Sequence, residues 1–158
     1  MYTLDELRKF IELDTVHTII RTPSDQAVYE LHKKQITDKW VSMTDKMLCT
    51  VFGVQCCVDG AGKMYVDRTT IPKDVKLELL QNDFPYPICD NMRHYVLWKL
   101  NGQVTSDDIH NAMTDLQKTV TVTDYVYWEN APYKKSVPGI EHIHIIVQLE
   151  LLNNNMYV

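Results

Sequence analysis

The stretch that decides the fold is Glu141-His142-Ile143-His144-Ile145-Ile146-Val147, near the end of the chain. Residues two apart on a β-strand point to the same face of a sheet. His142 and His144 therefore project side by side, whereas Ile143, Ile145 and Val147 face the other way. The pattern predicts a final strand over Ile140–Leu149 that has one histidine-bearing face and one apolar face.

The residues before this strand predict two more strands with a helix between them. His94–Trp98 has the aromatic and β-branched composition of a strand, and Val120–Trp128 alternates valines with polar residues. Between these two segments, Thr105 or Ser106 begins a helix. The pattern of Asp74–Gln81 is ambiguous, because it fits a strand and a short helix equally well.

The first third of the chain carries helix signals. Thr3 and Glu6 form a capping-box pattern, and the pair Thr22-Pro23 is a typical helix start. Ser42 begins a third helix, for which Gly53 is a stop signal. The sequence therefore places several helices ahead of the strands.

The turn signal Asp59-Gly60-Ala61-Gly62 joins two short predicted strands, Gln55–Val58 and Lys63–Asp67. Helices followed by strands predict a single α+β domain over residues 1–158, with N-terminal helices packed on a mainly antiparallel sheet. We divide it into a helical part (1–53), a loop or hairpin insertion (54–72) and a sheet part with one helix (73–158).

Composition excludes several classes of function. Sixteen Lys and Arg against 21 Asp and Glu give a net charge of −5, which disfavours general binding to nucleic acid or to anionic membranes. No segment reaches the about 20 consecutive apolar residues of a membrane span, and the N-terminus does not read as a secretory signal. The four cysteines form no C-x-x-C pair, so we expect buried free thiols and a cytoplasmic, reducing location.

The histidine pair is the strongest chemical feature, and three interpretations stay open. His142 and His144 could ligate zinc or another divalent metal, with His94 as the third ligand. They could instead act as a general acid and base, or donate hydrogen bonds to a phosphate. The third interpretation is that they are hydrogen-bonded histidines of the core. The remaining histidines, His17, His32 and His110, have polar neighbours and are expected to be exposed to solvent.

Other candidate residues sit at strand ends or on a proline-stiffened segment, where polar and aromatic groups could converge on the histidine face. These candidate ligand-binding residues are Asn82, Asp83, Tyr86, Trp98, Trp128, Asn130, Lys135 and Ser136. Lys134, Lys135 and Ser136 could receive an anionic group, and Trp128 could stack on a ring. The alternative is an ordinary turn with solvated lysines and a core tryptophan.

Several blocks of this sequence resemble a known family in order and spacing. They are Asn82-Asp83-Phe84-Pro85-Tyr86, His94-Tyr95-Val96-Leu97-Trp98, Trp128-Glu129-Asn130, and Ser136-Val137-Pro138-Gly139-Ile140-Glu141-His142-Ile143-His144-Ile145. Together with Arg21-Thr22-Pro23, Tyr29 and Trp40-Val41-Ser42, they resemble the family of the fungal N-acetylglucosamine-induced protein, a domain of unknown function.

The resemblance runs from about Arg21 to Val147. The chain departs from the family pattern at Glu129, where an aromatic residue is usual, and at Lys134-Lys135, where Leu-Gln is usual. The family also occurs in protists and large DNA viruses and is described as cytoplasmic, and it implies a shared fold and site location without implying a reaction.

Two functions follow from the sequence. The first is a soluble domain whose pocket binds a small polar or phosphorylated ligand, with metal-assisted hydrolysis as an extension of that role. The alternative is a non-enzymatic protein-interaction or assembly component, such as part of a virion. The sequence leaves open whether the protein is an enzyme.

Overall fold

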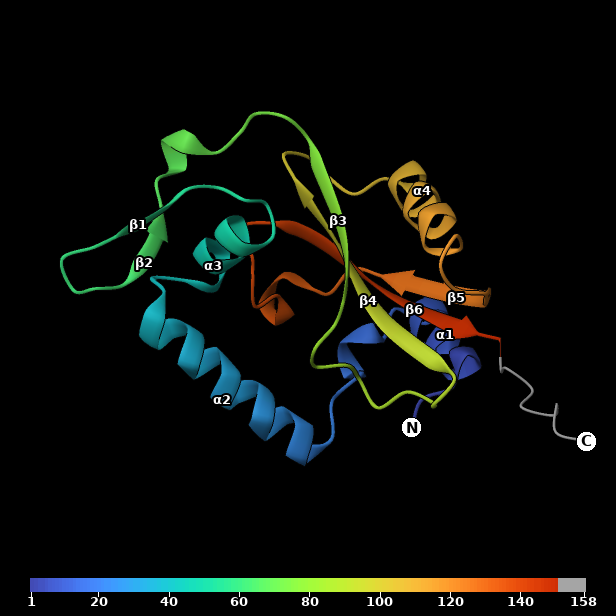
Figure 1. Cartoon of the computed structure of the whole chain (residues 1–158). Helices are drawn as coiled ribbons and strands as arrows, with labels where there is room; N and C mark the ends of the chain where they lie inside the picture. The colour runs from blue at the N-terminus through green and yellow to red at the C-terminus, as the bar shows by residue number, and fades with distance from the viewer. Residues whose placement is uncertain (151–158) are drawn as a thin grey trace, which may run out of the picture.

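The structure, a computed structural model, describes residues 1–150 and has an α+β architecture (Figure 1). The helices are α1 (Leu4–Glu12), α2 (Pro23–Lys39), α3 (Met43–Thr50) and α4 (Ser106–Leu116). The strands are β1 (Cys56–Val58), β2 (Met64–Val66), β3 (Lys76–Gln81), β4 (Met92–Leu100), β5 (Val122–Trp128) and β6 (Glu141–Leu149). Short 3-10 turns lie at η1 (Val16–Thr18), η2 (Arg68–Thr70) and η3 (Pro132–Lys134).

The main sheet has four strands in the order β3-β4-β6-β5, and each neighbouring pair is antiparallel. The predicted histidine strand, β6, therefore lies inside the sheet, between β4 and β5. The ambiguous segment 74–81 is a strand, because its main chain pairs with β4 from Lys76↔Leu100 to Gln81↔Tyr95. The predicted hairpin forms a separate two-stranded sheet, β1-β2.

The helices begin where the sequence places their caps. The side-chain oxygens of Thr3, Thr22, Ser42 and Thr105 each accept a hydrogen bond from the main-chain N–H three residues later. Each bond satisfies one N–H that the first turn of a helix leaves without a partner. The predicted α+β fold, with N-terminal helices and a mainly antiparallel sheet, is therefore confirmed.

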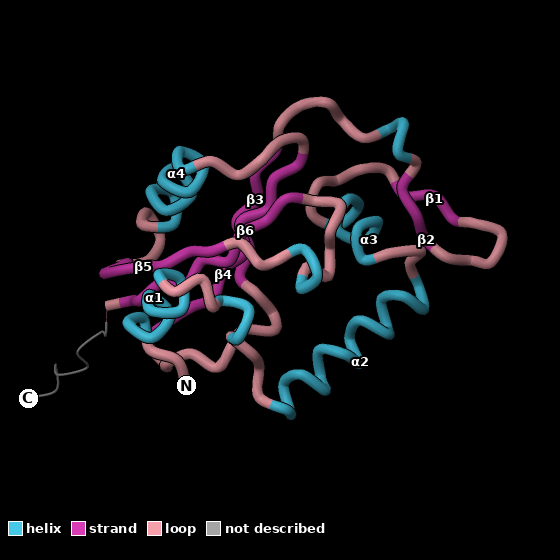
Figure 2. Tube along the Cα trace, turned by 180° about the vertical axis from the view of Figure 1, so that it is seen from behind, coloured by secondary structure: helices cyan, strands magenta, loops and turns pink. Residues whose placement is uncertain are grey.

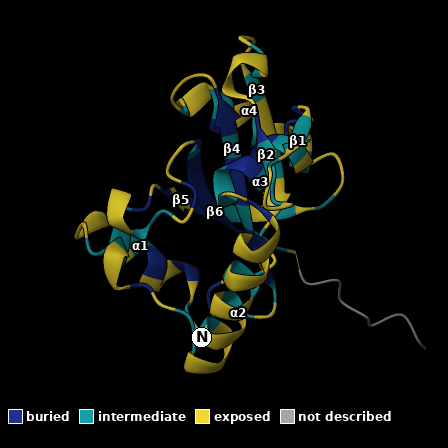
Figure 3. Ribbon diagram, turned by 90° about the vertical axis from the view of Figure 1, so that its left-hand side faces the viewer, coloured by how far each residue is buried: buried dark blue, intermediate teal, exposed yellow. Residues whose placement is uncertain are grey.

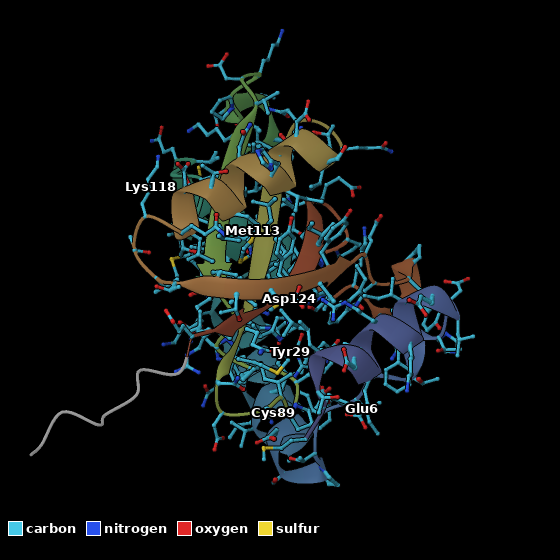
Figure 4. All side chains as sticks on the ribbon, turned by 90° about the vertical axis from the view of Figure 1, so that its right-hand side faces the viewer. Glu6, Tyr29, Cys89, Met113, Lys118 and Asp124 are labelled. Carbon is cyan, nitrogen blue, oxygen red and sulfur yellow. A yellow bond between two sulfur atoms is a disulfide. The ribbon has the colours of Figure 1, made fainter. Side chains whose placement is uncertain are left out.

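Helices lie on both faces of the main sheet. Figure 4 shows α4, with Met113, and α1, with Glu6, on opposite sides of β5. Met113 packs with Ile145 and Val147 of β6 in one apolar cluster, whereas Leu7 of α1 packs with Ile146 in another. Consecutive residues of β6 therefore belong to different layers of the core.

Helix α2 buries little of its surface. Figure 2 shows it as a rod along the outside of the molecule, and Figure 3 shows most of its surface exposed. Ile36 is its one buried residue. A helix with so little buried apolar surface draws its stability from a few contacts on its inner side, and these contacts surround the candidate site.

The cysteine prediction is wrong for one pair. Cys49 and Cys56 form a disulfide, with their Cα atoms 6.0 Å apart, whereas Cys57 and Cys89 are free and half-buried. The chain brings the pair together because it turns after α3 at Gly53, whose φ of +67° suits glycine. Sequence spacing alone does not reveal such a turn geometry.

Among residues 1–150, the structure contains no helix that is long and apolar enough to cross a lipid bilayer.

Candidate functional site

A cavity of about 260 Å³ lies between the histidine face of the sheet and the inner sides of α2 and α3. The floor comes from β4 and β6, through Trp98, His142 and His144. The proline-stiffened segment after β3 and the loop after β5 complete the wall. Strand register sets the positions of the side chains on the cavity floor, since Trp98 lies opposite His142.

Eight of the candidate residues from the sequence line this cavity. They are Asn82, Asp83, Tyr86, Trp98, Asn130, Ser136, His142 and His144. His94, Trp128 and Lys135 do not line it. The structure therefore gathers most of the candidates, drawn from segments far apart in the sequence, around one space.

His144 and His94 form a buried hydrogen-bonded pair behind this wall. The distance from Nε2 of His94 to Nδ1 of His144 is 2.9 Å, and the two side chains come from neighbouring strands. On its other side, Nε2 of His144 lies 2.7 Å from Nδ2 of Asn130. Both ring nitrogens of His144 are therefore engaged inside the protein.

Trp128 fixes the orientation of the Asn130 amide. Its indole N–H donates to Oδ1 of Asn130 at 3.0 Å, so the amide nitrogen of Asn130 must face His144 and donate to it. A single proton lies between Nδ1 of His144 and Nε2 of His94, so one of these two nitrogens donates and the other accepts. The sequence prediction that Trp128 stacks on a ligand ring does not match its place, since it is buried and faces Asn130 and His144.

Burial keeps both histidines neutral. The main-chain nitrogen of Tyr86 and the side-chain amide of Asn82 each lie 3.3 Å from Nδ1 of His94. Burial, with the positive charge of Arg21, lowers the pKa of His94 to about 3. Burial also holds the pKa of His144 well below its usual value.

His142 differs from His144 in having one open ring nitrogen. Its Nδ1 lies 2.9 Å from the main-chain carbonyl of Ile140 and donates to it, which leaves Nε2 as an acceptor. The ring stacks on Trp98 with centroids 4.4 Å apart. Burial lowers the pKa of His142, against the opposing effect of the Ile140 carbonyl, so this ring is also neutral near pH 7.

Basic side chains dominate the charge around the cavity. Arg21, Lys46 and Lys134 line it, whereas Asp83 is its one carboxylate. Arg21 donates from Nε to the main-chain carbonyl of Phe84 at 2.9 Å, and its guanidinium lies over the Tyr29 ring at 4.2 Å. Within residues 1–150, neither Arg21 nor Lys46 forms an ion pair with a carboxylate.

The two adjacent lysines before Ser136 point to different partners. Lys134 donates from Nζ to the main-chain carbonyl of His17, and burial lowers its pKa. Lys135 is ion-paired with Glu129 at 2.6 Å and with Glu141 at 3.5 Å. The charge of Lys135 is therefore already balanced, and its predicted role as a ligand for anions has no support in this geometry.

Arg21, Tyr29, His32 and Lys46 are site residues that motif reasoning missed. The expectation that His32 is exposed is wrong, because it is half-buried in the wall and its ring lies 4.6 Å from the Phe84 ring. His17 and His110 are exposed, as expected. The available signal for Arg21 was its place in the resemblance, directly before the helix start at Thr22-Pro23.

The predicted three-histidine metal site does not form a suitable ligand set. Within residues 1–150, no group of three or more His, Cys, Asp or Glu side chains is arranged to hold a metal ion. His94 and His144 use their facing nitrogens on each other, and Asn130 occupies the remaining nitrogen of His144. We therefore derive no metal chemistry from these histidines.

These features define a class of protein: an α+β domain whose antiparallel sheet carries a buried histidine pair beneath a cavity lined by cations. The chain belongs to the family DUF3605, described as proteins of unknown function, whose profile matches residues 3–148. This match confirms the family recognised from the sequence, a domain of unknown function of the N-acetylglucosamine-induced protein type.

The fold is similar to that seen in the crystal structure of HTC1. The TM-score is 0.62 at 16% sequence identity, and the alignment covers 95% of this chain and 86% of HTC1. At this identity the similarity concerns the fold alone. A search of curated protein sequences gave no match.

Proposed function

We propose that the protein binds a small phosphorylated ligand in the cavity between α2, α3 and the sheet. The observation that carries the proposal is Arg21, a guanidinium held in place at the cavity wall without a carboxylate partner in the described chain. Arginine presents planar N–H groups that suit phosphate oxygens.

The anchoring of Arg21 supports this role. Its Nε bond to the Phe84 carbonyl and its contact with the Tyr29 ring restrict the side chain. The guanidinium also lies 5.1 Å from the centre of the Tyr86 ring. A restrained cation loses less conformational entropy on binding than a free one, so its hydrogen bonds contribute more to affinity.

The local charge supports an anionic ligand as well. The chain as a whole carries a net charge of −5, yet three cations and one carboxylate line the cavity. Such a concentration of positive charge in an acidic protein attracts small anions to this one place. Ser136, whose hydroxyl oxygen accepts a bond from the Tyr29 hydroxyl at 2.8 Å, keeps its own O–H free to donate to the same ligand.

The histidines support binding more than hydrolysis. His94 and His144 are neutral and fully engaged with their protein partners, so they are not placed to transfer a proton to a ligand. Their role in the proposal is to hold Asn130, Tyr86 and the floor of the cavity in position.

Calorimetric titration with inorganic phosphate, pyrophosphate and a panel of phosphate monoesters tests the proposal. We expect saturable binding that the Arg21→Met variant weakens about tenfold or more, the loss expected for a charge-assisted hydrogen bond. The Lys46→Met variant should weaken binding to a smaller degree. The matched control is Lys118→Met, which removes an exposed cation just after the C-terminal end of α4.

No binding of any of these anions by the wild-type protein would contradict the proposal. Equal losses in Arg21→Met and Lys118→Met would contradict it too, because they would show an unspecific charge effect. Lys135→Met should leave anion binding unchanged, because Glu129 and Glu141 already balance the charge of Lys135. Weaker binding by this variant would instead support the sequence prediction that Lys135 contacts the ligand.

Two predictions from the sequence remain alongside this proposal. An interaction or assembly role has one observation in its favour, the exposed Val28 and Leu31 side chains on α2, and light scattering tests it. The cytoplasmic location was expected from the cysteine pattern and from the family resemblance, whereas a Cys49–Cys56 disulfide is more typical of oxidising compartments. Thiol counting on protein quenched directly from cells tests the location.

A further inference from the structure

His142 offers an unused hydrogen-bond acceptor in the cavity wall. The residue is only 4% exposed, and its Nδ1 proton goes to the Ile140 carbonyl. Nε2 has no hydrogen-bond partner in the described chain. Because no fully buried side-chain nitrogen or oxygen of residues 1–150 lacks a partner, Nε2 must be the part of this ring that the cavity leaves open.

The ring cannot turn to satisfy this nitrogen in another way. Trp98 stacks on it with an interplanar angle of 29°, and the Ile140 bond fixes which nitrogen points inward. The ring is neutral near pH 7 because burial lowers its pKa. Nε2 therefore presents a lone pair, which accepts a hydrogen bond from an O–H or N–H group. It carries no proton to donate to an anionic oxygen.

We propose that the cavity selects phosphorylated ligands that also carry a hydroxyl or N–H group, and that this group donates a hydrogen bond to Nε2 of His142. The inference rests on the proposed function and adds the second group that the ligand must carry. His142 is then the residue that determines specificity, while Arg21 binds the phosphate.

The physical reason is the cost of leaving a desolvated acceptor unpaired. A ligand that fills the cavity displaces the water at Nε2, and a ligand without a donor leaves that nitrogen without a partner. Sites built to bond a polar group of the substrate discriminate against the analogue that lacks the group for this reason. The expected discrimination from one such bond is about tenfold in affinity.

Matched pairs of phosphate monoesters test the inference by calorimetry. Glycerol 3-phosphate is compared with propyl phosphate, and 2-hydroxyethyl phosphate with ethyl phosphate, so that each pair differs in hydroxyl groups alone. We expect wild-type protein to bind at least one hydroxylated member about ten times more tightly than its partner.

Two substitutions assign the effect to His142. His142→Phe keeps a ring against Trp98 but removes the acceptor, so the ratio of affinities within each pair should fall to about one. His142→Gln restores an acceptor oxygen near the position of Nε2 and should recover part of the preference. Binding of propyl phosphate by both variants shows that they are folded.

The outcomes separate the two proposals. Equal binding of both members of each pair by wild-type protein would overturn the inference and leave the phosphate site intact. A preference that survives in His142→Phe would overturn it as well. Failure of wild-type protein to bind any phosphate compound would overturn the proposed function, and this inference with it.

Discussion

The two faces of β6 are made from alternate residues of one strand, yet they have opposite character. Ile143, Ile145 and Val147 face α4 and pack in an apolar cluster with Met113. His142 and His144 face the other way, where both are buried but hydrogen-bonded or open to a cavity. The first face gives stability through packing, whereas the second holds polar groups in fixed positions.

The difference shows how a small domain can bury a polar site inside its core without losing stability. The α4 face is dry, so each buried side chain there contributes through its apolar area. On the histidine face, every fully buried side-chain nitrogen or oxygen of the described chain has a partner. Burial of these groups is tolerated because those partners replace the hydrogen bonds lost to water.

The largest expected effect lies on the apolar face. Ile145→Ala should lower the free energy of unfolding by about 2–5 kcal/mol, because Ile145 is fully buried and the substitution leaves a cavity. Urea denaturation measures the change. A loss below about 1 kcal/mol would show that the sheet can close around the site and that the face is less tightly packed than described.

The next effect concerns the polar network. Asn130→Ala removes the partner of the Trp128 indole N–H and of Nε2 of His144 together. An unpaired buried group costs about 1–3 kcal/mol, so we expect a loss of that size or larger in denaturant titrations. Asn111→Ala is the comparison at an exposed asparagine of α4. Equal effects of the two substitutions would argue against a specific role for the network.

The two faces should also differ in their response to pH. His94 has a folded pKa of about 3 against about 6.5 in the unfolded chain, so below pH 6.5 the unfolded state binds more protons. Stability is therefore full above pH 7 and is lost as the pH falls, by about 2 kcal/mol between pH 7 and pH 5 from His94 alone. His144 adds to this loss, because its pKa is lowered in the same direction.

Denaturant titrations from pH 8 to pH 5 measure this dependence. Replacement of the exposed His110 by Gln should leave it unchanged, whereas His94→Leu should make it shallower even if the variant is less stable overall. A wild-type protein with the same stability at pH 5 and pH 7 would show that folding does not lower the pKa values of the pair.

The smallest effect is expected at Lys135, on the edge of the histidine face. Its partners Glu129 and Glu141 have side chains that are 57% and 40% exposed, so solvent screens the two ion pairs. Lys135→Met should change the free energy of unfolding by less than about 1 kcal/mol. Thermal melting at low and high salt measures this change, and a larger loss would mean that the pairs are more buried than their exposure indicates.

Much of the fold could be predicted because its signals are local. Caps such as Thr3 and Thr105 bond to groups three residues away, and strand alternation repeats every second residue. Segment 74–81 was ambiguous because its identity as β3 depends on pairing with β4. The Cys49–Cys56 disulfide escaped prediction for a similar reason, since it depends on the backbone turn at Gly53.

The candidate site shows the same division. Most of the candidate polar and aromatic residues do line the cavity, because rare residue types at strand ends are a signal that the sequence carries. Arg21, His32 and Lys46 lie at or in helices without a distinctive motif, and they reach the cavity only through the packing of α2 and α3. Lys135 was predicted to bind an anion because it lies directly before Ser136, but its ammonium group is ion-paired with Glu129.

By itself, the sequence determined that β6 has two unlike faces, because side-chain direction along a strand follows from backbone geometry alone. Only the tertiary structure decided that His144 is closed by His94 and Asn130 while His142 keeps an open nitrogen. His94 and His144 are 50 residues apart in the chain. Which donor meets which ring is fixed by strand register and loop position, and these are properties of the folded chain as a whole.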